Sequence, residues 1–324
     1  MGTTVLGSSS PFFTVATSLN PPDEVDCFDG AGQQVWSFTN GTAQYLVDTA
    51  RHAEGADTGP VDVAVAACGD AGCTLFGRTS ATDTTRWALP LPDCGTNVEG
   101  GTYVNMEASD SGNRVAFLCH FVDAGNTSAR VYLVDMQEGL ITWTYDLGEA
   151  VKAGQGQVQI TPSGSFVLFV NEGGVPTPNS ATAFVLDGAT GALRDAVPIP
   201  FFITAAISDS GDYVAVGDDG AVHVLLWDAG SGKYKASNDL QPSPNFIPWD
   251  IQISTGADAT EAVVVGSISG DVKTVAVENW ALATGVKQGA WVSATNPVLQ
   301  ENPTLRTDGD YVRDRPLSIG DTRP

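Results

Sequence analysis

The side chains that could carry chemistry in this 324-residue chain do not form a catalytic pattern. Its three histidines, His52, His120 and His223, lie in unrelated contexts. His120 follows Cys119, but neighbours on a strand point to opposite faces and cannot oppose each other as a Cys-His dyad. His223 lies in an alternating strand pattern, which is typical of a side chain satisfied within its sheet. We therefore predict no catalytic residue.

Two acidic turns contain ligand types that suit Ca²⁺. Asp218-Asp219-Gly220 and Asp308-Gly309-Asp310 offer carboxylates and backbone carbonyls. Neither completes the Asp-x-Asp-x-Asp-Gly loop that ends in Glu, so both are interpreted as solvated turns. Cysteine and histidine spacing does not fit zinc, and Gly266–Gly270 has the wrong spacing for a serine nucleophile elbow. We predict no metal site and no bound cofactor, with Ca²⁺ as the weaker alternative.

The five cysteines lie at positions 27, 68, 73, 94 and 119. Cys68 and Cys73 flank Gly-Asp-Ala-Gly, which predicts a hairpin with a cysteine at each strand end, close enough to bridge if the loop is tight. Cys94 and Cys119 are the other disulfide candidates, and buried thiols are the alternative for these cysteines. The odd count leaves at least one cysteine free or paired with another chain.

Composition and charge favour an extracellular or cell-surface protein. Two N-glycosylation sequons, at Asn40 and Asn126, fall in turn-rich segments that should be exposed. The formal charge of −23 repels phosphate backbones and disfavours nucleic-acid binding. Only 16 % of residues are charged, so the remaining surface must be Gly, Ser, Thr, Asn and Ala, as in secreted proteins. No apolar stretch approaches the ~18–20 residues that span a bilayer, and no signal peptide is visible.

A turn landmark of the form Ser/Thr-x-Ser/Asp-Gly, followed by a β-branched apolar run, recurs along the chain. Its clear copies begin at Ser109, Thr161 and Ser208, and their glycines at 112, 164 and 211 are 52 and 47 residues apart. A shorter copy is Thr307-Asp308-Gly309, and a degraded one is Ser254-Thr255-Gly256. Short strands rich in Val, Phe, Tyr and Leu lie between the landmarks. Four strands per ~50 residues predict the blades of a β-propeller.

We predict an all-β, single-domain propeller over residues 1–324, with six four-stranded blades and seven as the alternative. The expected internal blades are 44–91, 103–146, 155–199, 202–238 and 247–293. Residues 10–38 resemble the outer part of a blade, and residues 303–319 begin with an inner-strand signature. A propeller must bury its open edges, so we expect the two ends to share a composite blade that closes the ring.

A second signature, an acidic residue followed four positions later by Gly and then often by Trp, comes after the third strand of a unit. It occurs as Asp135–Gly139 before Trp143, as Asp187–Gly191 and as Asp228–Gly232, while Asp29-Gly30-Ala31-Gly32 leads to Trp36. This pattern resembles the repeat of PQQ-like propellers and, more loosely, that of the WD40-like group. The residues themselves suit a turn, in which Asp accepts backbone N–H bonds and Gly takes positive φ.

The resemblance implies a blade and not an activity. Quinoprotein dehydrogenases of the PQQ-like superfamily hold their cofactor with adjacent disulfide-bonded cysteines, a Ca²⁺ site and a stacking Trp. No two cysteines are adjacent in this chain, so we expect no quinone cofactor. Four tryptophans near the expected fourth strands are predicted to pack between blades, with an exposed binding platform as the alternative: Trp36, Trp87, Trp143 and Trp291.

The leading functional hypothesis is a non-catalytic binding or structural module for protein or glycan partners, including copies of itself in a larger assembly. A ring of similar loops on each face favours such partners over one buried small molecule. A propeller enzyme, such as a glycan hydrolase or lyase with acidic side chains at the channel mouth, is one alternative. An intracellular WD40-like scaffold is the other.

Overall fold

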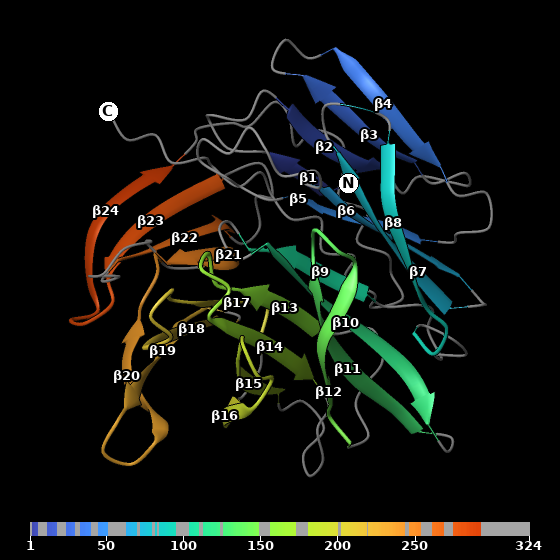
Figure 1. The fold of residues 1–324 in the computed structure, drawn as a ribbon. Coiled ribbons are helices and arrows are strands. Elements are labelled where there is room, and N and C mark those ends of the chain that lie inside the picture. Colours follow the sequence, from blue (N-terminus) through green and yellow to red (C-terminus); the bar gives the residue numbers. More distant parts are fainter. Residues whose placement is uncertain are drawn as a thin grey trace.

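The fold is built from β-strands, which the computed structural model places in six four-stranded sheets (Figure 1). No helix occurs among the residues that it describes, so none of them forms a helix able to cross a membrane. The described residues are 2–5, 12–17, 24–29, 33–39, 45–50, 63–69, 72–79, 82, 84–94, 104–109, 113–123, 126–148, 156–172, 181–199, 202–218, 220–243, 246–253, 261–268 and 275–292.

The sheets are numbered one to six in chain order, and each is an antiparallel meander of four consecutive strands. Sheet one contains β1 (Gly2–Val5), β2 (Phe12–Thr17), β3 (Glu24–Asp29) and β4 (Gln34–Thr39). Sheet two contains β5 (Tyr45–Ala50), β6 (Val63–Gly69), β7 (Gly72–Thr79) and β8 (Thr84–Leu91). Sheet three contains β9 (Val104–Ala108), β10 (Arg114–Asp123), β11 (Asn126–Asp135) and β12 (Leu140–Asp146).

The second half of the chain repeats this organisation. Sheet four contains β13 (Gly156–Ile160), β14 (Phe166–Glu172), β15 (Ala181–Asp187) and β16 (Leu193–Ile199). Sheet five contains β17 (Thr204–Ile207), β18 (Tyr213–Gly217), β19 (Val222–Asp228) and β20 (Lys233–Leu240). Sheet six contains β21 (Phe246–Ile253), β22 (Glu261–Ile268), β23 (Val275–Ala281) and β24 (Val286–Val292).

The first strands of neighbouring sheets lie side by side near the middle of the molecule, and the fourth strands lie outside (Figure 1). Contacts between first strands run from β1 to β5, β9, β13, β17 and β21. Apolar clusters of buried side chains lie between successive sheets from one to six, so sheets two to five present side chains to both neighbours. All of β6 is buried, which explains why its sequence, Val63–Gly69, is small and apolar without alternation.

The strands expected from the sequence agree closely with those observed. In sheet three, for example, the expected blade 103–146 contains four sequence runs rich in Val, Phe, Tyr and Leu, at 103–108, 114–122, 129–135 and 141–146, and its four strands fall there. One strand was not expected: β1, whose Gly-Thr-Thr-Val sequence is short and is not followed by the Ser-x-Ser-Gly landmark. It pairs with β2 and is the first strand of sheet one, which therefore has four strands like the other sheets.

The predicted composite blade joins residues 10–38 to residues 303–319, and the latter lie outside the described residues. The landmark copies at 254–256 and 307–309 and the acidic turn at 308–310 also lie outside them. Closure of the ring through the two ends therefore stays a prediction.

Candidate interaction face

Because each sheet is a meander, the connections between strands lie on two different faces of the molecule, one at each end of the strands. In an antiparallel meander, the connection between strands one and two lies at the same end as that between strands three and four. We name the face at this end the hairpin face; it carries the turns after β9, β11, β13, β15, β17 and β19. The face at the opposite end, which we name the loop face, carries the connections between strands two and three and those between sheets.

The Ser/Thr landmark forms the turn between the first and second strands of sheets three, four and five. Ser208 uses its backbone N–H to bond the carbonyl of Tyr213 at 2.9 Å, while its hydroxyl accepts the N–H of Tyr213 at 3.0 Å. Thr161 does the same with Phe166. Gly211 closes the turn at φ 69°, a region that favours glycine. In sheets four and five, one hydroxyl side chain and one glycine thus satisfy this turn, which accounts for the spacing of the landmark there.

The Asp-x-x-x-Gly signature forms the turn between the third and fourth strands. Asp135 Oδ1 accepts the backbone N–H groups of Gln137 and Glu138, each at 2.9 Å, and Gly139 adopts φ 67°. Asp187 accepts three bonds, with the hydroxyl of Thr190 at 2.7 Å. That hydroxyl, with the turn amides, lowers the pKa of Asp187 despite its partial burial. The structural interpretation of this signature is confirmed.

The same turn in sheet five carries an additional ion pair. Asp228 Oδ1 accepts the N–H of Gly230 at 3.0 Å, while Oδ2 accepts the hydroxyl of Ser231 at 2.9 Å and also pairs with the ammonium of Lys235. The ammonium of Lys235 and these bonds lower the pKa of the exposed Asp228 to about 2. Asp228 therefore stays ionised at any physiological pH and acts as a turn-forming group.

Tryptophans from fourth strands join neighbouring sheets across the hairpin face. Trp87 donates its indole N–H to the carbonyl of Met136 at 2.9 Å, and Trp143 donates to Gly188 at 3.0 Å. Each ring covers the glycine of the same turn, because a Cβ at Gly191 would lie 2.7 Å from the Trp143 ring. Trp36 donates to Thr79 at 3.1 Å. These three tryptophans pack between sheets as predicted, and the side chain of Trp291 lies outside the described part.

Sheet four replaces the tryptophan with a carboxylate, which the sequence did not reveal. Asp195 lies opposite Val185, as Trp143 lies opposite Leu133, and its side chain is 3 % exposed. It accepts bonds from Lys233 Nζ at 2.7 Å and from the N–H of Tyr234 at 2.8 Å, both in sheet five. Burial raises the pKa of Asp195, but the bonds from Lys233 and from two backbone amides lower it by more.

Two arginines on the hairpin face also donate hydrogen bonds to carbonyls of the next sheet. Arg114 Nη1 donates to the carbonyls of Gly164 at 3.0 Å and Gly188 at 2.8 Å, which joins sheet three to sheet four. Arg194 donates to Gly211 at 3.0 Å and stacks on Trp227, with its guanidinium carbon 3.9 Å from the ring centroid. The described polar groups of this face thus bond either within their own turn, as Asp135 and Asp187 do, or to a neighbouring sheet, which makes the hairpin face a scaffold.

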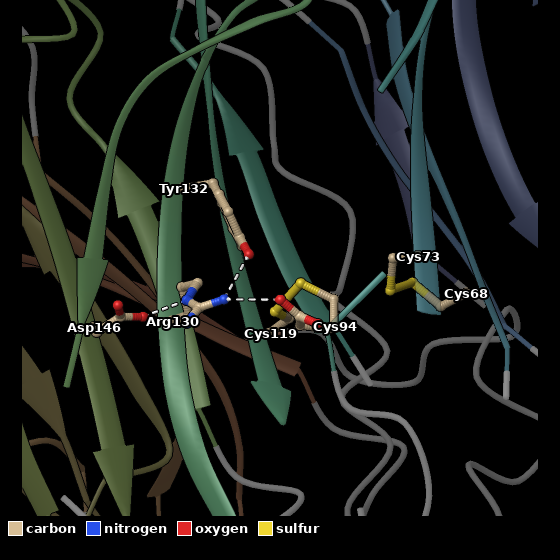
Figure 2. Close-up of a disulfide and its surroundings, with 8 residues drawn as sticks. Cys68, Cys73, Cys94, Cys119, Arg130, Tyr132 and Asp146 are labelled. Atoms are coloured by element: carbon tan, nitrogen blue, oxygen red, sulfur yellow. Dashed lines mark hydrogen bonds and ion pairs between the residues drawn. A yellow bond between two sulfur atoms is a disulfide. The ribbon is translucent and has the colours of Figure 1, made fainter. Parts of the chain in front are cut away.

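The loop face carries two cysteine pairs at disulfide-bonding distance (Figure 2). Cys68 and Cys73 lie directly opposite each other in the β6–β7 hairpin, with an S–S distance of 2.10 Å. Cys94 follows β8 and lies 2.20 Å from the sulfur of Cys119 on β10, so this pair ties sheet two to sheet three. All four are buried in one apolar cluster, and Cys27 is buried on β3.

A charged clamp lies beside the second pair (Figure 2). Arg130 on β11 contacts two carboxylates, Asp146 directly across on β12 and Asp93 at 3.7 Å, and donates to the hydroxyl of Tyr132 at 3.2 Å. Its guanidinium carbon also lies 4.4 Å from the ring centroid of Phe121. Burial lowers the pKa of Arg130, but Asp146 and Tyr132 raise it by more, so its charge is permanent.

Sheet five has an equivalent clamp with a histidine in place of the arginine. His223 on β19 lies five residues before Asp228, as Arg130 lies five residues before Asp135. Its cross-strand partner is Asp239, which matches Asp146. The prediction that His223 is satisfied within its sheet is correct, because both of its ring nitrogens have carboxylate partners. Asp218, from the turn considered for Ca²⁺, is one of them.

The other candidate ligands and bases have structural partners. His120 is buried, and its Nε2 lies 2.9 Å from Asn171 Oδ1 in the next sheet. Burial lowers the pKa of His120, so it is neutral near pH 7. Cys119, its neighbour, lies at bonding distance from Cys94 and not beside the imidazole. Within the described ranges, no group of three His, Cys, Asp or Glu side chains could hold a metal ion.

A buried carboxylate also occurs in sheet six. Glu278 on β23 is 1 % exposed, and its Oε1 accepts bonds from Lys287 Nζ at 2.7 Å and from the hydroxyl of Ser243 at 2.6 Å. Ser243 lies in the connection between β20 and β21. The hydrogen bonds of Ser243 with Glu278 and Lys287 therefore fix that connection to sheet six, which is a structural role.

The remaining sequence candidates are only partly described. Asn126 begins β11, directly after the two-residue connection of the β10–β11 hairpin, so its sequon lies at the edge of the loop face. Asn40 and His52 lie outside the described residues. Exposed apolar side chains are common on protein surfaces. Most exposed large apolar side chains of the described part lie on fourth strands, where Leu140 and Ile141 are neighbours in sequence, and Leu226 lies on β19. The most exposed are Leu140, Leu193 and Val286.

Comparison with known proteins identifies the fold. No family model and no curated protein matches the chain. It is similar to the β-propeller domain of Cps50 (Swd1) from Myceliophteria thermophila, with TM-score 0.53 and 12 % identity over 90 % of this chain and 88 % of that one. It is also similar to a Lactobacillus plantarum protein, with TM-score 0.56 and 16 % identity over 90 % and 84 % of the two chains.

A third similar structure is a functionally unknown protein from Desulfotomaculum acetoxidans, with TM-score 0.54 and 12 % identity over 82 % of this chain and 76 % of that one. At these identities the likeness concerns the fold alone. Together with the repeated four-stranded sheets, it supports a propeller fold for this chain.

Proposed function

We propose that this chain is a non-catalytic propeller module, outside the cell or at its surface, that binds a protein or glycan partner through the loop face. Its six sheets are the blades of a closed ring in this proposal. The repeated Asp-x-x-x-Gly turns and inter-sheet tryptophans support the assignment of each sheet as a blade.

The observation that carries the proposal is the contrast between the two faces. On the hairpin face, the turns between the third and fourth strands have four or five residues in every sheet, and the carbonyls of Met136 and Gly188 in two of them bond the adjacent sheet. The connection between β5 and β6, with twelve residues, is the long exception on this face. The connections on the loop face differ from sheet to sheet: β10 and β11 are separated by two residues, whereas β14 ends at Glu172 and β15 begins at Ala181. Binding residues concentrate on variable loops that a rigid scaffold positions, so the loop face is the better candidate.

Charge narrows the class of partner. Asp93, Asp146 and Asp239 are 73 %, 53 % and 57 % exposed on the loop face. These carboxylates and the net charge of −23 repel phosphate and sulfate groups. We expect a partner that presents neutral sugar hydroxyls or basic protein side chains.

The extracellular assignment is supported by the two cysteine pairs at bonding distance and by the two sequons. Disulfides persist in oxidising compartments and are rare in the cytosol. Intact mass of the native protein, measured before and after reduction and glycosidase treatment, tests the assignment. Five free thiols and no glycan would contradict it.

The binding proposal is tested with the full-length protein on a glycan array and against a panel of basic and acidic proteins of known sequence. Two charge reversals give a matched comparison: Asp93→Arg on the loop face and Glu138→Arg on the hairpin face, both at exposed positions. We expect the first to weaken binding by at least ~10-fold and the second to leave it within ~2-fold, since charge reversal of a central contact costs more than ~1.4 kcal/mol.

One result would show that the variants are misfolded, and another would count against the proposal. Equal loss in both variants would indicate an effect on folding, which circular dichroism of each variant would reveal. Loss confined to Glu138→Arg would place the partner on the hairpin face and overturn the assignment of the face.

A further inference from the structure

Both ring nitrogens of His223 face carboxylates. Nε2 lies 2.9 Å from Asp218 Oδ2, at the start of the β18–β19 connection, and Nδ1 lies 2.9 Å from Asp239 Oδ1 near the end of β20. Among the described residues, these two carboxylates are the charged groups that act on the imidazole. The side chain of His223 is 25 % exposed, so protons can reach it from solvent.

The protonation state of the His223 imidazole decides whether its contacts to Asp218 and Asp239 can both be hydrogen bonds. An ionised carboxylate accepts hydrogen bonds but donates none, and a neutral imidazole has one N–H donor. A neutral His223 can therefore donate to one aspartate, while its other nitrogen directs a lone pair at the second carboxylate. Only the imidazolium, with two N–H donors and a positive charge, satisfies both Asp218 and Asp239.

The two aspartates are not equivalent. Asp218 is 23 % exposed, and its Oδ1 accepts the N–H of Ala221 at 2.8 Å, which holds it in the β18–β19 connection. Asp239 is 57 % exposed, and its contact to His223 is the one side-chain interaction it makes within the described part of the chain. Release of one contact on loss of the proton would therefore free Asp239.

Sheet three shows that this position does not need a titrating residue. Arg130 lies at the same register and contacts Asp146 across the strand pair, with a charge that does not change near neutral pH. The chain thus contains a fixed form and a titratable form of one clamp. The two clamps share the same strand register and differ in the side chain that occupies the central position, arginine in sheet three and histidine in sheet five.

We propose that His223 is a pH-responsive clamp, which joins the β18–β19 connection to the end of β20 when it is protonated and releases Asp239 when it is neutral. The clamp lies on the loop face, but the inference does not rest on partner binding there. Each release adds one negative charge to this part of the surface, because the imidazolium is lost between two carboxylates.

The direction of the pH effect follows from the surroundings of His223. Burial lowers the pKa of His223, whereas the bonds and charges of Asp218 and then Asp239 raise it by more. A pKa that is higher in the folded state gives stability that is fully present below the ordinary histidine value of ~6.5. That stability is lost as pH rises through the higher pKa of the folded protein.

The test is an NMR titration of the full-length protein, with His223 assigned by comparison with a His223→Gln variant. We expect His223 to titrate above the ordinary value of ~6.5, and the carboxyl carbon of Asp239 to follow the same midpoint. Amide exchange of Leu240 on β20, corrected for its intrinsic pH dependence, should rise about two- to fivefold across that midpoint, as for loss of one partly exposed ion pair. Exchange of Ala221 should not change.

Substitutions separate the clamp from general pH effects. His223→Arg should remove the pH dependence of Leu240 exchange and keep it slow, as a copy of the Arg130 clamp. Asp239→Asn should lower the midpoint of His223, and it serves as the second variant if His223→Arg does not fold. A midpoint at or below the ordinary histidine value, or the same pH dependence in wild type and His223→Arg, would overturn the proposal.

Discussion

Trp143 on β12 donates its indole N–H to the backbone carbonyl of Gly188 in the next sheet, over a distance of 3.0 Å. The same oxygen accepts a second bond from Arg114 at 2.8 Å. Trp87, one sheet earlier, makes the equivalent bond to Met136 at 2.9 Å, and no second side chain donates to that oxygen within the described residues. Among the described residues, the carbonyl of Gly188 therefore has two side-chain donors, whereas the equivalent carbonyl of Met136 has one.

This difference predicts unequal effects of matched substitutions. Trp87→Phe leaves the carbonyl of buried Met136 without a donor, which should cost ~1–3 kcal/mol of the free energy of unfolding beyond the change in packing. Trp143→Phe leaves Arg114 on Gly188, so the corresponding loss should stay below ~1 kcal/mol. Urea denaturation of both variants measures the difference. Equal losses would show that packing of the ring, and not its N–H, determines the contact.

The turns could be predicted from the sequence, but the contacts between sheets could not. Ser208 with Gly211, and Asp187 with Gly191, satisfy local backbone groups, so residue type and spacing are sufficient to recognise them. Asp195 gave no such signal. Its partner Lys233 lies 38 residues away, and their contact depends on the way sheets four and five pack.

The two clamps have the same limitation. Arg130 and Asp146 are cross-strand neighbours, but recognising the pair requires the register between β11 and β12, which contains a bulge after Leu133. The spacing of five residues between His223 and Asp228 can be read from the sequence. The contact between His223 and Asp218 cannot, because it depends on the course of the β18–β19 connection. A comparison of units aligned on the Asp-x-x-x-Gly turn would have found the Arg130–His223 equivalence.

The two cysteine pairs should contribute unequally to stability. Cys94 and Cys119 are separated by 25 residues, whereas Cys68 and Cys73 are separated by five. A cross-link that closes a longer loop restricts the unfolded chain more, so loss of the first pair should cost ~3 kcal/mol and loss of the second ~2 kcal/mol. The double variants Cys94→Ser/Cys119→Ser and Cys68→Ser/Cys73→Ser, compared by chemical denaturation, measure both values.

Thiol counting provides the control for that comparison. The five cysteines less the four in pairs leave one, Cys27, so the denatured, unreduced protein should react with one equivalent of a thiol reagent. Reaction of three or five equivalents would mean that at least one pair is reduced in the native protein. The stability difference would then have to be explained by packing in the shared apolar cluster.

Asp195 should make part of the stability depend on acid. Its pKa is lower in the folded protein than in the unfolded chain, so its contribution is present above ~4 and is lost as pH falls through the folded value. Asp195→Asn keeps an acceptor for the N–H of Tyr234 but removes the charge that pairs with Lys233. The variant should be less stable near pH 7 and should lose less stability between about pH 5 and about pH 2. Parallel pH dependence in both proteins would contradict this.

The last prediction concerns closure of the ring. Sheet one already has four strands from residues 2–39, so the C-terminal segment is not needed to complete the strand count of that sheet. If residues 303–319 also close the ring, as the sequence predicts, the side chain of Leu305 should be buried on an inner strand and should contribute ~1.5–3 kcal/mol. Leu305→Asp and truncation after Asn302 should then lower the free energy of unfolding together. Deletion of residues 1–6, which removes β1 from its pairing with β2, is the matched change at the other end. Loss of stability from that deletion alone would show that β1 completes the sheet without the C-terminal segment.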